Sequence, residues 1–235
     1  MRPKLNIVTL GVITPELFTF FRELKQNNNR EWFEANKQRY EKHVREPLLQ
    51  FITDFGLRLA EISPHYVADA RRSGGSLFRI NRDIRFAKDK SPYKTAAGLH
   101  FRHEVGKDAH APGFYLHLEP DGIFAGVGIW QPDAPALSKI RNAIVAHPER
   151  WQRASQDEGF QAVFTIGGES LKNPPKGYDP NHAFIEDLKR KDFIASVSFS
   201  EADTCTPDFM DRYAEVCRRA APYAGFLTTA MGLSW

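Results

Sequence analysis

Residues 113–130 read GFYLHLEPDGIFAGVGIW, and the pattern of this stretch decides the class of fold. Apolar residues recur at every second position over 113–119 and again over 122–130, which is the period of a β-strand with one buried face. The connection Pro120-Asp121-Gly122 is a short, glycine-containing link of the kind found in β-hairpins. Along the first arm the polar and apolar side chains take opposite faces: Tyr115, His117 and Glu119 against Phe114, Leu116 and Leu118. The sequence therefore predicts an antiparallel hairpin with one packed face and one polar face.

Further strands are predicted on both sides of this hairpin. Alternating patterns indicate three more extended segments, which are 76–81, 95–102 and 193–199. In the first of them the alternation places Arg82, just beyond its end, on the apolar side with Phe78 and Ile80. A charged side chain on that side must be paired and hydrogen-bonded, or the strand must bend.

Helices are predicted before and after the sheet. Thr14 and Pro15 form a helix start, and Asn29 can cap a second helix, which Pro47 must kink or restart. After the hairpin, residues 133–147 have a helical period that turns four side chains inward, namely Leu137, Ile140, Ile144 and Val145. Thr206-Pro207-Asp208 repeats the capping pattern and predicts a last helix.

This order of elements predicts an α+β fold with N-terminal helices, a central, mostly antiparallel sheet and C-terminal helices. We expect a single domain over residues 14–235 and a leader or N-terminal extension over residues 1–13. At 235 residues, with 42% hydrophobic residues and 18 Phe, the chain has ample material for a core. No stretch approaches the roughly 18 apolar residues of a membrane span, so we expect no membrane association.

The cysteine content indicates a reducing compartment. Cys205 and Cys217 are too few for a disulfide framework and lack the paired spacing of a zinc site. A cytoplasmic location is the simplest expectation.

Positive charge is concentrated in one part of the chain. Residues 76–107 contain eight Lys or Arg against three acidic residues, a net charge of +5, whereas the whole chain carries +3. If these side chains converge in the fold, they raise the local electrostatic potential and attract anionic ligands.

The residues of this segment suit an anion clamp. Arg79, Arg82 and Arg85 each offer a planar fork that holds a carboxylate or a phosphate by two hydrogen bonds. Other members of the segment can add point charges, a hydroxyl donor or a counter-charge, and the full predicted ligand-binding set is Arg79, Arg82, Asp83, Arg85, Lys90, Tyr93 and Lys94. A structural alternative stands beside it, in which Asp83 and Asp89 pair with the arginines and fasten a loop to the sheet.

Two side chains are candidates for proton chemistry. His117 lies on the polar face of the hairpin, and histidine is the residue type suited to general acid-base chemistry near neutral pH, while Tyr93 has a hydroxyl within the basic segment. A metal site is not predicted, although the histidines at 100, 103, 110 and 117 invite it, because His100 and His103 point to opposite faces of a strand. The chain has no phosphate-binding glycine loop, no dinucleotide fingerprint and no serine-hydrolase elbow, so no cofactor is predicted. Whether the protein is an enzyme stays open.

The motif Arg79-x-x-Arg82-Asp83-x-Arg85-Phe86, followed by Asp89-Lys90-x-x-Tyr93, resembles the defining motif of domain-of-unknown-function family 2461, a group of bacterial proteins. The resemblance extends to residues 18–40, to the hairpin and to residues 188–193, and so spans most of the chain. It implies membership of that family and implies no particular reaction.

Three functions remain open on the sequence. The first is a binding site for a small anion that carries a phosphate or a carboxylate group. Such a site can serve binding alone or an enzymatic reaction. The second is a nucleic-acid-binding module, in which Phe86, Tyr93 and Phe101 would stack on bases. The third is an interaction scaffold in which the arginines only form a structural network. The oligomeric state is not predicted.

We predict that Cys205 and Cys217 do not form a disulfide. If both lie in or beside one helix, the twelve residues between them span about 18 Å, far beyond disulfide reach. A thiol titration of the denatured, unreduced protein should give two free thiols per chain, and a count of none would contradict the prediction.

Overall fold

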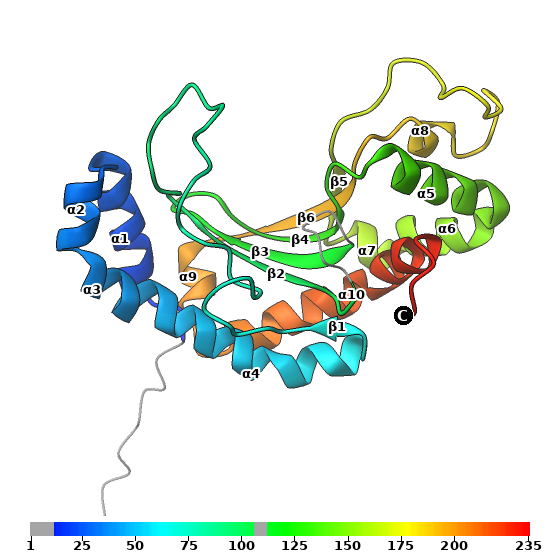
Figure 1. The fold of residues 1–235 in the computed structure, drawn as a ribbon. Helices are drawn as coiled ribbons and strands as arrows, with labels where there is room; N and C mark the ends of the chain where they lie inside the picture. The colour runs from blue at the N-terminus through cyan, green and yellow to red at the C-terminus, as the bar shows by residue number, and fades with distance from the viewer. Residues whose placement is uncertain (1–11, 106–111) are drawn as a thin grey trace, which may run out of the picture.

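The computed structural model describes residues 12–105 and 112–235. Within these residues a single six-stranded antiparallel sheet crosses the molecule in the order β1-β2-β3-β4-β6-β5 (Figure 1). Its strands are β1 Tyr66–Val67, β2 Ala97–His103, β3 Gly113–Leu118, β4 Ile123–Ile129, β5 Thr165–Gly167 and β6 Phe193–Phe199. The predicted hairpin is confirmed as β3 and β4, in which Leu116 is paired with Ala125. Asp121 takes a positive φ of 63° in the connection between the two strands.

Helices precede the sheet, as predicted. They are α1 Pro15–Gln26, α2 Arg30–Ala35, α3 Lys37–Tyr40, the π-helix η1 Glu41–Arg45 and α4 Glu46–Ile62. The Asn29 side chain accepts a hydrogen bond from the Trp32 amide at 2.9 Å, which confirms its role as the cap of α2. Pro47 has no N–H to continue the helical ladder, and the π-helical turn η1 precedes it while the backbone stays helical through Arg45 and Glu46 into α4.

Helices also follow the hairpin, so the α+β prediction is confirmed. They are α5 Ala134–Ala146, α6 Pro148–Ser155, α7 Glu158–Gln161, α8 Ile185–Leu188, α9 Glu201–Thr204 and α10 Phe209–Ala230. The cysteines at 205 and 217 are both free in the structure.

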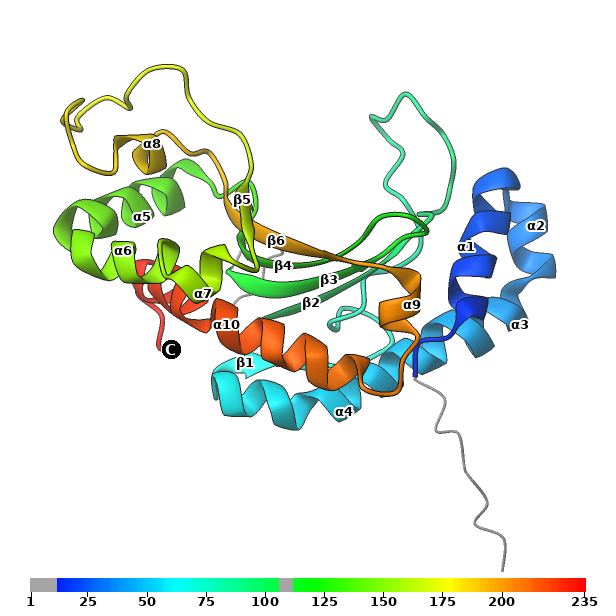
Figure 2. The same ribbon diagram turned by 180° about the vertical axis from the view of Figure 1, so that it is seen from behind.

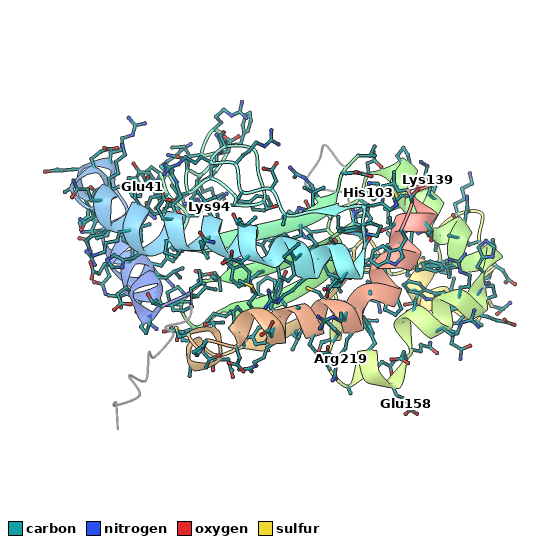
Figure 3. The ribbon with its side chains drawn as sticks, turned by 90° about the horizontal axis from the view of Figure 1, so that it is seen from below. Glu41, Lys94, His103, Lys139, Glu158 and Arg219 are labelled. Carbon is teal, nitrogen blue, oxygen red and sulfur yellow. The ribbon has the colours of Figure 1, made fainter. Side chains whose placement is uncertain are left out.

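The core lies between one face of the sheet and the two longest helices. Helices α4 and α10 run side by side beneath the strands, as Figure 3 shows from below. The ring centroids of Phe55 on α4 and Phe101 on β2 are 4.8 Å apart, and the Tyr213 ring of α10 lies 5.0 Å from Phe55. These aromatic rings are excluded from water and bind the helices to the sheet by hydrophobic burial.

The opposite face of the sheet carries different residues and has no long helix across it (Figures 1 and 2). Its central positions are half-buried polar, aromatic and glycine residues, which are Tyr115, His117, Phe124, Gly126 and Gly128. Helices α1 to α3 stand at one end of this face and α5, α6 and α8 at the other. The fold therefore holds a concave, polar sheet surface between two helical walls.

Three local expectations are wrong. Residues 76–81 form no regular strand and make only isolated bridges, from Leu77 to Leu99 and from Asn81 to Tyr93. The two bridges are four residues apart in this segment but six residues apart in the segment opposite, so a bulge breaks the ladder. Val145 is 43% exposed, because the inward stripe of α5 passes through Ala136, Ile140 and Ile144.

The third correction concerns the start of the last helix. Thr206 was expected to cap it, but the N-cap of α10 is Asp208, and the Thr206 hydroxyl instead donates to the Asp203 carbonyl at 2.8 Å. Helix α9 lies immediately upstream, and its C-terminal carbonyl groups recruit that hydroxyl.

Of the predicted N-terminal extension, residues 1–11 lie outside the described residues, and so does His110. Ile13 at its end is 2% exposed and joins the core. Over the described parts of the chain, no helix has the length and apolar character needed to cross a bilayer.

Two glycines on one strand face provide a test of the sheet. Gly128 has φ +120°, and a Cβ there would lie 1.9 Å from the Phe193 carbonyl oxygen on β6, whereas a Cβ at Gly126 would meet neighbours only at 3.7 Å and beyond. We predict that Gly128→Ala lowers the free energy of unfolding by more than about 3 kcal/mol and that Gly126→Ala, the matched control, changes it by less than about 1 kcal/mol. Urea denaturation measures both values, and equal losses in the two variants would contradict the described register of β4 and β6.

Candidate functional site

The arginine loop, residues 79–96, projects from the end of the sheet beside α1 and α2 (Figure 1). Its base is held by the Arg82 amide, which donates to the Pro92 carbonyl at 2.9 Å, and by the Lys94 amide, which donates to the Ile80 carbonyl at 2.8 Å. Phe86, in the outer part of the loop, is 96% exposed. The loop is therefore anchored at its base and open to solvent beyond it.

Tyr93 fixes the position of the loop base. Its ring stacks on Phe33 with centroids 4.1 Å apart and is 5% exposed. The Asn28 side chain, from the turn between α1 and α2, brackets the Tyr93 backbone: its Nδ2 donates to the carbonyl at 2.9 Å, and its Oδ1 accepts from the amide at 3.1 Å. The N-terminal helices thus position the start of the site.

A pocket of about 520 Å³ lies where the α1–α2 turn, the arginine loop and the polar sheet face meet. We call it the cationic pocket, and its walls are formed by Lys25, Asn28, Phe78, Arg82, Asp89, Ser91, Tyr93, Lys94, Thr95, Ala96, Gly98, Tyr115 and His117. Its size falls within the range usual for small-molecule sites.

The predicted site residues divide into two groups. Arg82, Tyr93, Lys94 and His117 line the cationic pocket, although they come from distant parts of the sequence. The remaining predicted residues, Arg79, Asp83, Arg85 and Lys90, do not line it.

Two of those outlying residues form a local pair. Arg85 Nη2 lies 2.6 Å from Asp83 Oδ2, and both side chains are well exposed. The hydrogen bonds from Arg85 lower the pKa of Asp83 to about 2. Lys90 Nζ donates to the Ile84 carbonyl at 3.0 Å. These contacts shape the outer part of the arginine loop, as the structural alternative expects.

Arg82 faces the cationic pocket and is also tied to the loop. Its Nη1 pairs with Asp89 and donates to the Ser91 carbonyl at 3.2 Å. Hydrogen bonds from Ser91, and then from Arg82, lower the pKa of Asp89 to about 2, so this carboxylate stays charged. Arg82 is paired, as expected, but its partner Asp89 is exposed rather than buried.

Lys94 is a half-buried cation of the site that has no carboxylate partner among the described residues. Its Nζ donates to the Arg79 carbonyl at 2.9 Å and lies 5.5 Å from the centroid of the Phe78 ring. Across the described ranges no carboxylate lies within 4.0 Å of this ammonium group, and burial, followed by the charge of Arg79, lowers the pKa of Lys94. An ammonium group that is half-removed from water and surrounded by like charge favours an anion beside it.

A chain of hydrogen bonds crosses the polar sheet face at the pocket. The Tyr115 hydroxyl lies 3.1 Å from His117 Nδ1, and His117 Nε2 lies 3.3 Å from Glu119 Oε2. The Thr95 hydroxyl donates to the other oxygen of Glu119 at 3.2 Å. Burial, followed by the charge of Glu119, raises the pKa of Tyr115 to about 12, so its hydroxyl keeps its proton.

Glycine creates the space for this chain. A Cβ on Gly98 would lie 2.4 Å from the Tyr115 hydroxyl oxygen, so the missing side chain lets the tyrosine lie across β2. On the other side the His117 ring stacks on Phe124, with centroids 4.9 Å apart. The imidazole is thereby held in one orientation.

The other histidines of the sheet take different roles. His100 is 8% exposed, and burial lowers its pKa to about 4, so it is a neutral side chain at physiological pH. The His103 Nε2 atom bonds the Ser234 carbonyl at 3.0 Å, on the opposite side of the sheet from His117. Among the described residues no cluster of three or more His, Cys, Asp or Glu is placed to hold a metal ion.

Sequence reasoning did not find Lys25 or Asn28 as site residues. They lie more than fifty positions before the arginine loop, at the end of an amphipathic helix, where a lysine and an asparagine have ordinary capping roles. Only the three-dimensional packing of α1 against the loop reveals them.

Comparison with known proteins identifies the chain. The model of the family described as "Conserved hypothetical protein (DUF2461)" matches residues 16–226. The chain belongs to the DUF2461 family. That match confirms the family resemblance, and in this DUF2461 member residues 79–93 lie in the arginine loop. No curated protein and no solved structure matches the chain significantly.

We predict that Asn28→Ala loosens the arginine loop without unfolding the domain, because it removes both hydrogen bonds to the Tyr93 backbone. Each bond is worth about 1 kcal/mol, so losing both costs about 2 kcal/mol, and amide hydrogen exchange at Arg82 and Lys94 should accelerate roughly thirtyfold. The matched control is Asn27→Ala, which loses only a bond to Glu23 within its own helix end. Equal exchange rates in the two variants would show that the bracket does not hold the loop.

Proposed function

We propose that the cationic pocket binds a small anionic ligand through a phosphate or carboxylate group. The observation that carries this proposal is the position of Lys94, whose half-buried ammonium group faces the pocket beside Arg82 with no carboxylate of its own among the described residues. Lys25 adds a third cation from the end of α1. A bound anion would supply the charge that the fold leaves uncompensated.

Arg82 suits the role of anion-binding fork. Both of its described contacts, to Asp89 and to the Ser91 carbonyl, use Nη1. The other guanidinium nitrogens have no bond to a described residue and can donate into the pocket. In this proposal Asp89 orients the arginine rather than neutralising the site, since three cations face one carboxylate there.

A small ligand is favoured over a nucleic acid by the burial of the aromatic residues. Tyr93 and Phe101 are 5% and 0% exposed, so neither ring is available to stack on a base, and only Phe86 remains. Because it is buried, the Tyr93 ring supports the pocket wall. Of the two residues predicted to transfer protons, His117 is therefore the better candidate. The proposal includes no cofactor and no membrane, and it places the protein in the cytoplasm, as the cysteine content predicts.

The test is thermal unfolding in the presence of sulfate, inorganic phosphate or citrate at fixed ionic strength. A ligand at one hundred times its Kd stabilises the folded state by about 2.7 kcal/mol, which raises the Tm by several degrees for a domain of this size. We predict such a shift for at least one of the three anions, with Lys94→Gln and Arg82→Gln each removing most of it. Arg85→Gln is the matched control, because Arg85 pairs with Asp83 away from the pocket, and it should keep the shift.

Two outcomes would overturn the proposal. One is an equal shift in the wild type and in both pocket variants, which would reflect the general stabilising effect of these salts. The other is micromolar or tighter oligonucleotide binding with a salt slope steeper than about −3, lost in the same variants, which would favour the nucleic-acid module.

A further inference from the structure

The hydrogen-bond chain at the pocket has a definite proton arrangement. Glu119 presents a carboxylate oxygen to His117 Nε2 at 3.3 Å, so that nitrogen must carry a proton to make a favourable contact. In a neutral imidazole the other nitrogen, Nδ1, is then an acceptor, and it accepts a hydrogen bond from the Tyr115 hydroxyl at 3.1 Å. The tyrosine therefore donates inward, to His117, and not into the pocket.

An anion in the pocket requires the opposite direction at Tyr115. The Tyr115 side chain lines the pocket, and an anionic oxygen beside it can only accept hydrogen bonds. If the hydroxyl turns to the anion, Nδ1 of His117 loses its donor in a half-buried site. A proton taken up at Nδ1 restores that bond, because the imidazolium then donates to the Tyr115 oxygen through Nδ1 and to Glu119 through Nε2.

We propose that the cationic pocket takes up its anion together with one proton, which His117 stores while Tyr115 donates its hydroxyl hydrogen to the ligand. Binding takes one anion and one proton from solvent, and the proton is held on His117 Nδ1. No covalent bond of the anion changes, and the anion and the proton leave together on release. This inference rests on the proposed anion-binding function and adds to it a coupled proton.

The charges around His117 supply the coupling. From its own strand and the following turn it faces Tyr115 and Glu119, and Phe124 of β4 covers its ring. From the other elements packed around the pocket, the titratable or charged side chains are Lys25, Arg82, Asp89, Tyr93 and Lys94. The three cations oppose an imidazolium, and Asp89 and Glu119 offset only part of that effect, so the charged form of His117 becomes favourable when an anion screens the cations.

The same arrangement suits a site for proton transfer. A neutral tyrosine that donates to the ligand, with an imidazolium behind it and a carboxylate behind that, can deliver a proton to a substrate oxygen and recover it from His117. We assign Tyr115 as the group that contacts the ligand, and His117 and Glu119 as positioning residues that act through it.

The pH dependence follows from the direction of proton movement. Because binding takes up a proton, affinity is greatest at low pH and falls as pH rises through the range in which imidazole titrates. The limiting slope is a tenfold loss of affinity per pH unit for one proton.

The experiment is calorimetric titration with sulfate, whose charge is constant from pH 5 to 9. It is run at several pH values in pairs of buffers with different ionisation enthalpies, which report the protons taken up per sulfate bound. The wild type should take up close to one proton in the upper part of this range. His117→Asn keeps an acceptor near the position of Nδ1 but cannot titrate, so it should bind sulfate with no linked proton. His182→Asn, in a loop outside the pocket, is the matched control and should behave as the wild type.

Two further variants separate the relay from other sources of protons. Tyr115→Phe should weaken sulfate binding about tenfold and remove the linked proton, and Glu119→Gln should move the uptake to lower pH. The ring carbon shifts of His117 in NMR spectra, recorded with and without sulfate, identify the group that titrates.

The possible results distinguish the two proposals. Sulfate binding with no proton uptake, or with the same uptake in His117→Asn, overturns the relay and leaves the anion site standing. No sulfate binding at any pH overturns the relay, and it overturns the anion site as well if phosphate and citrate also leave the Tm unchanged.

Discussion

The packing of α4 and α10 against one face of the sheet is the constraint on which the rest of the molecule depends. Phe55, Phe101 and Tyr213 concentrate the apolar contacts on that side. Because the hydrophobic core is complete on that side, the other face of the sheet can carry glycines and polar side chains. The helices at the two ends of that face leave its centre uncovered. The cationic pocket exists because the hydrophobic core is one-sided.

Much of this architecture is readable in the sequence, since it rests on strong local signals. The alternation in residues 113–130 fixes which of its side chains face water, and His117 and Tyr115 appear on the polar face as the period requires. Irregular backbone is less readable. The segment at 76–81 has a strand pattern, but its ladder is broken by two extra residues in the segment opposite, and a bulge of that kind has no signature in the pattern of one strand.

The site itself could be predicted only in part. Three arginines within seven positions indicate an anion clamp, yet the fold turns only Arg82 into the pocket and pairs Arg85 with its neighbour Asp83. Sequence spacing alone does not show which arginine lines the pocket and which forms only a local ion pair, because both arginines have an acidic residue nearby. The decisive difference is the direction of the loop, which depends on the contact between Asn28 and Tyr93 across sixty-five positions.

The place of α10 in the fold also has a kinetic meaning. This helix spans Phe209–Ala230, and its rings complete the core beneath strands that were synthesised about a hundred residues earlier. Strand β6 likewise inserts between β4 and β5, although a long excursion of the chain separates it from β4. During synthesis the part of the sheet's apolar underside that α10 covers therefore stays open until α10 has left the ribosome, and contacts of such long range close slowly. The nascent chain spends that interval with part of its aromatic surface uncovered, and uncovered apolar surface of this kind favours aggregation.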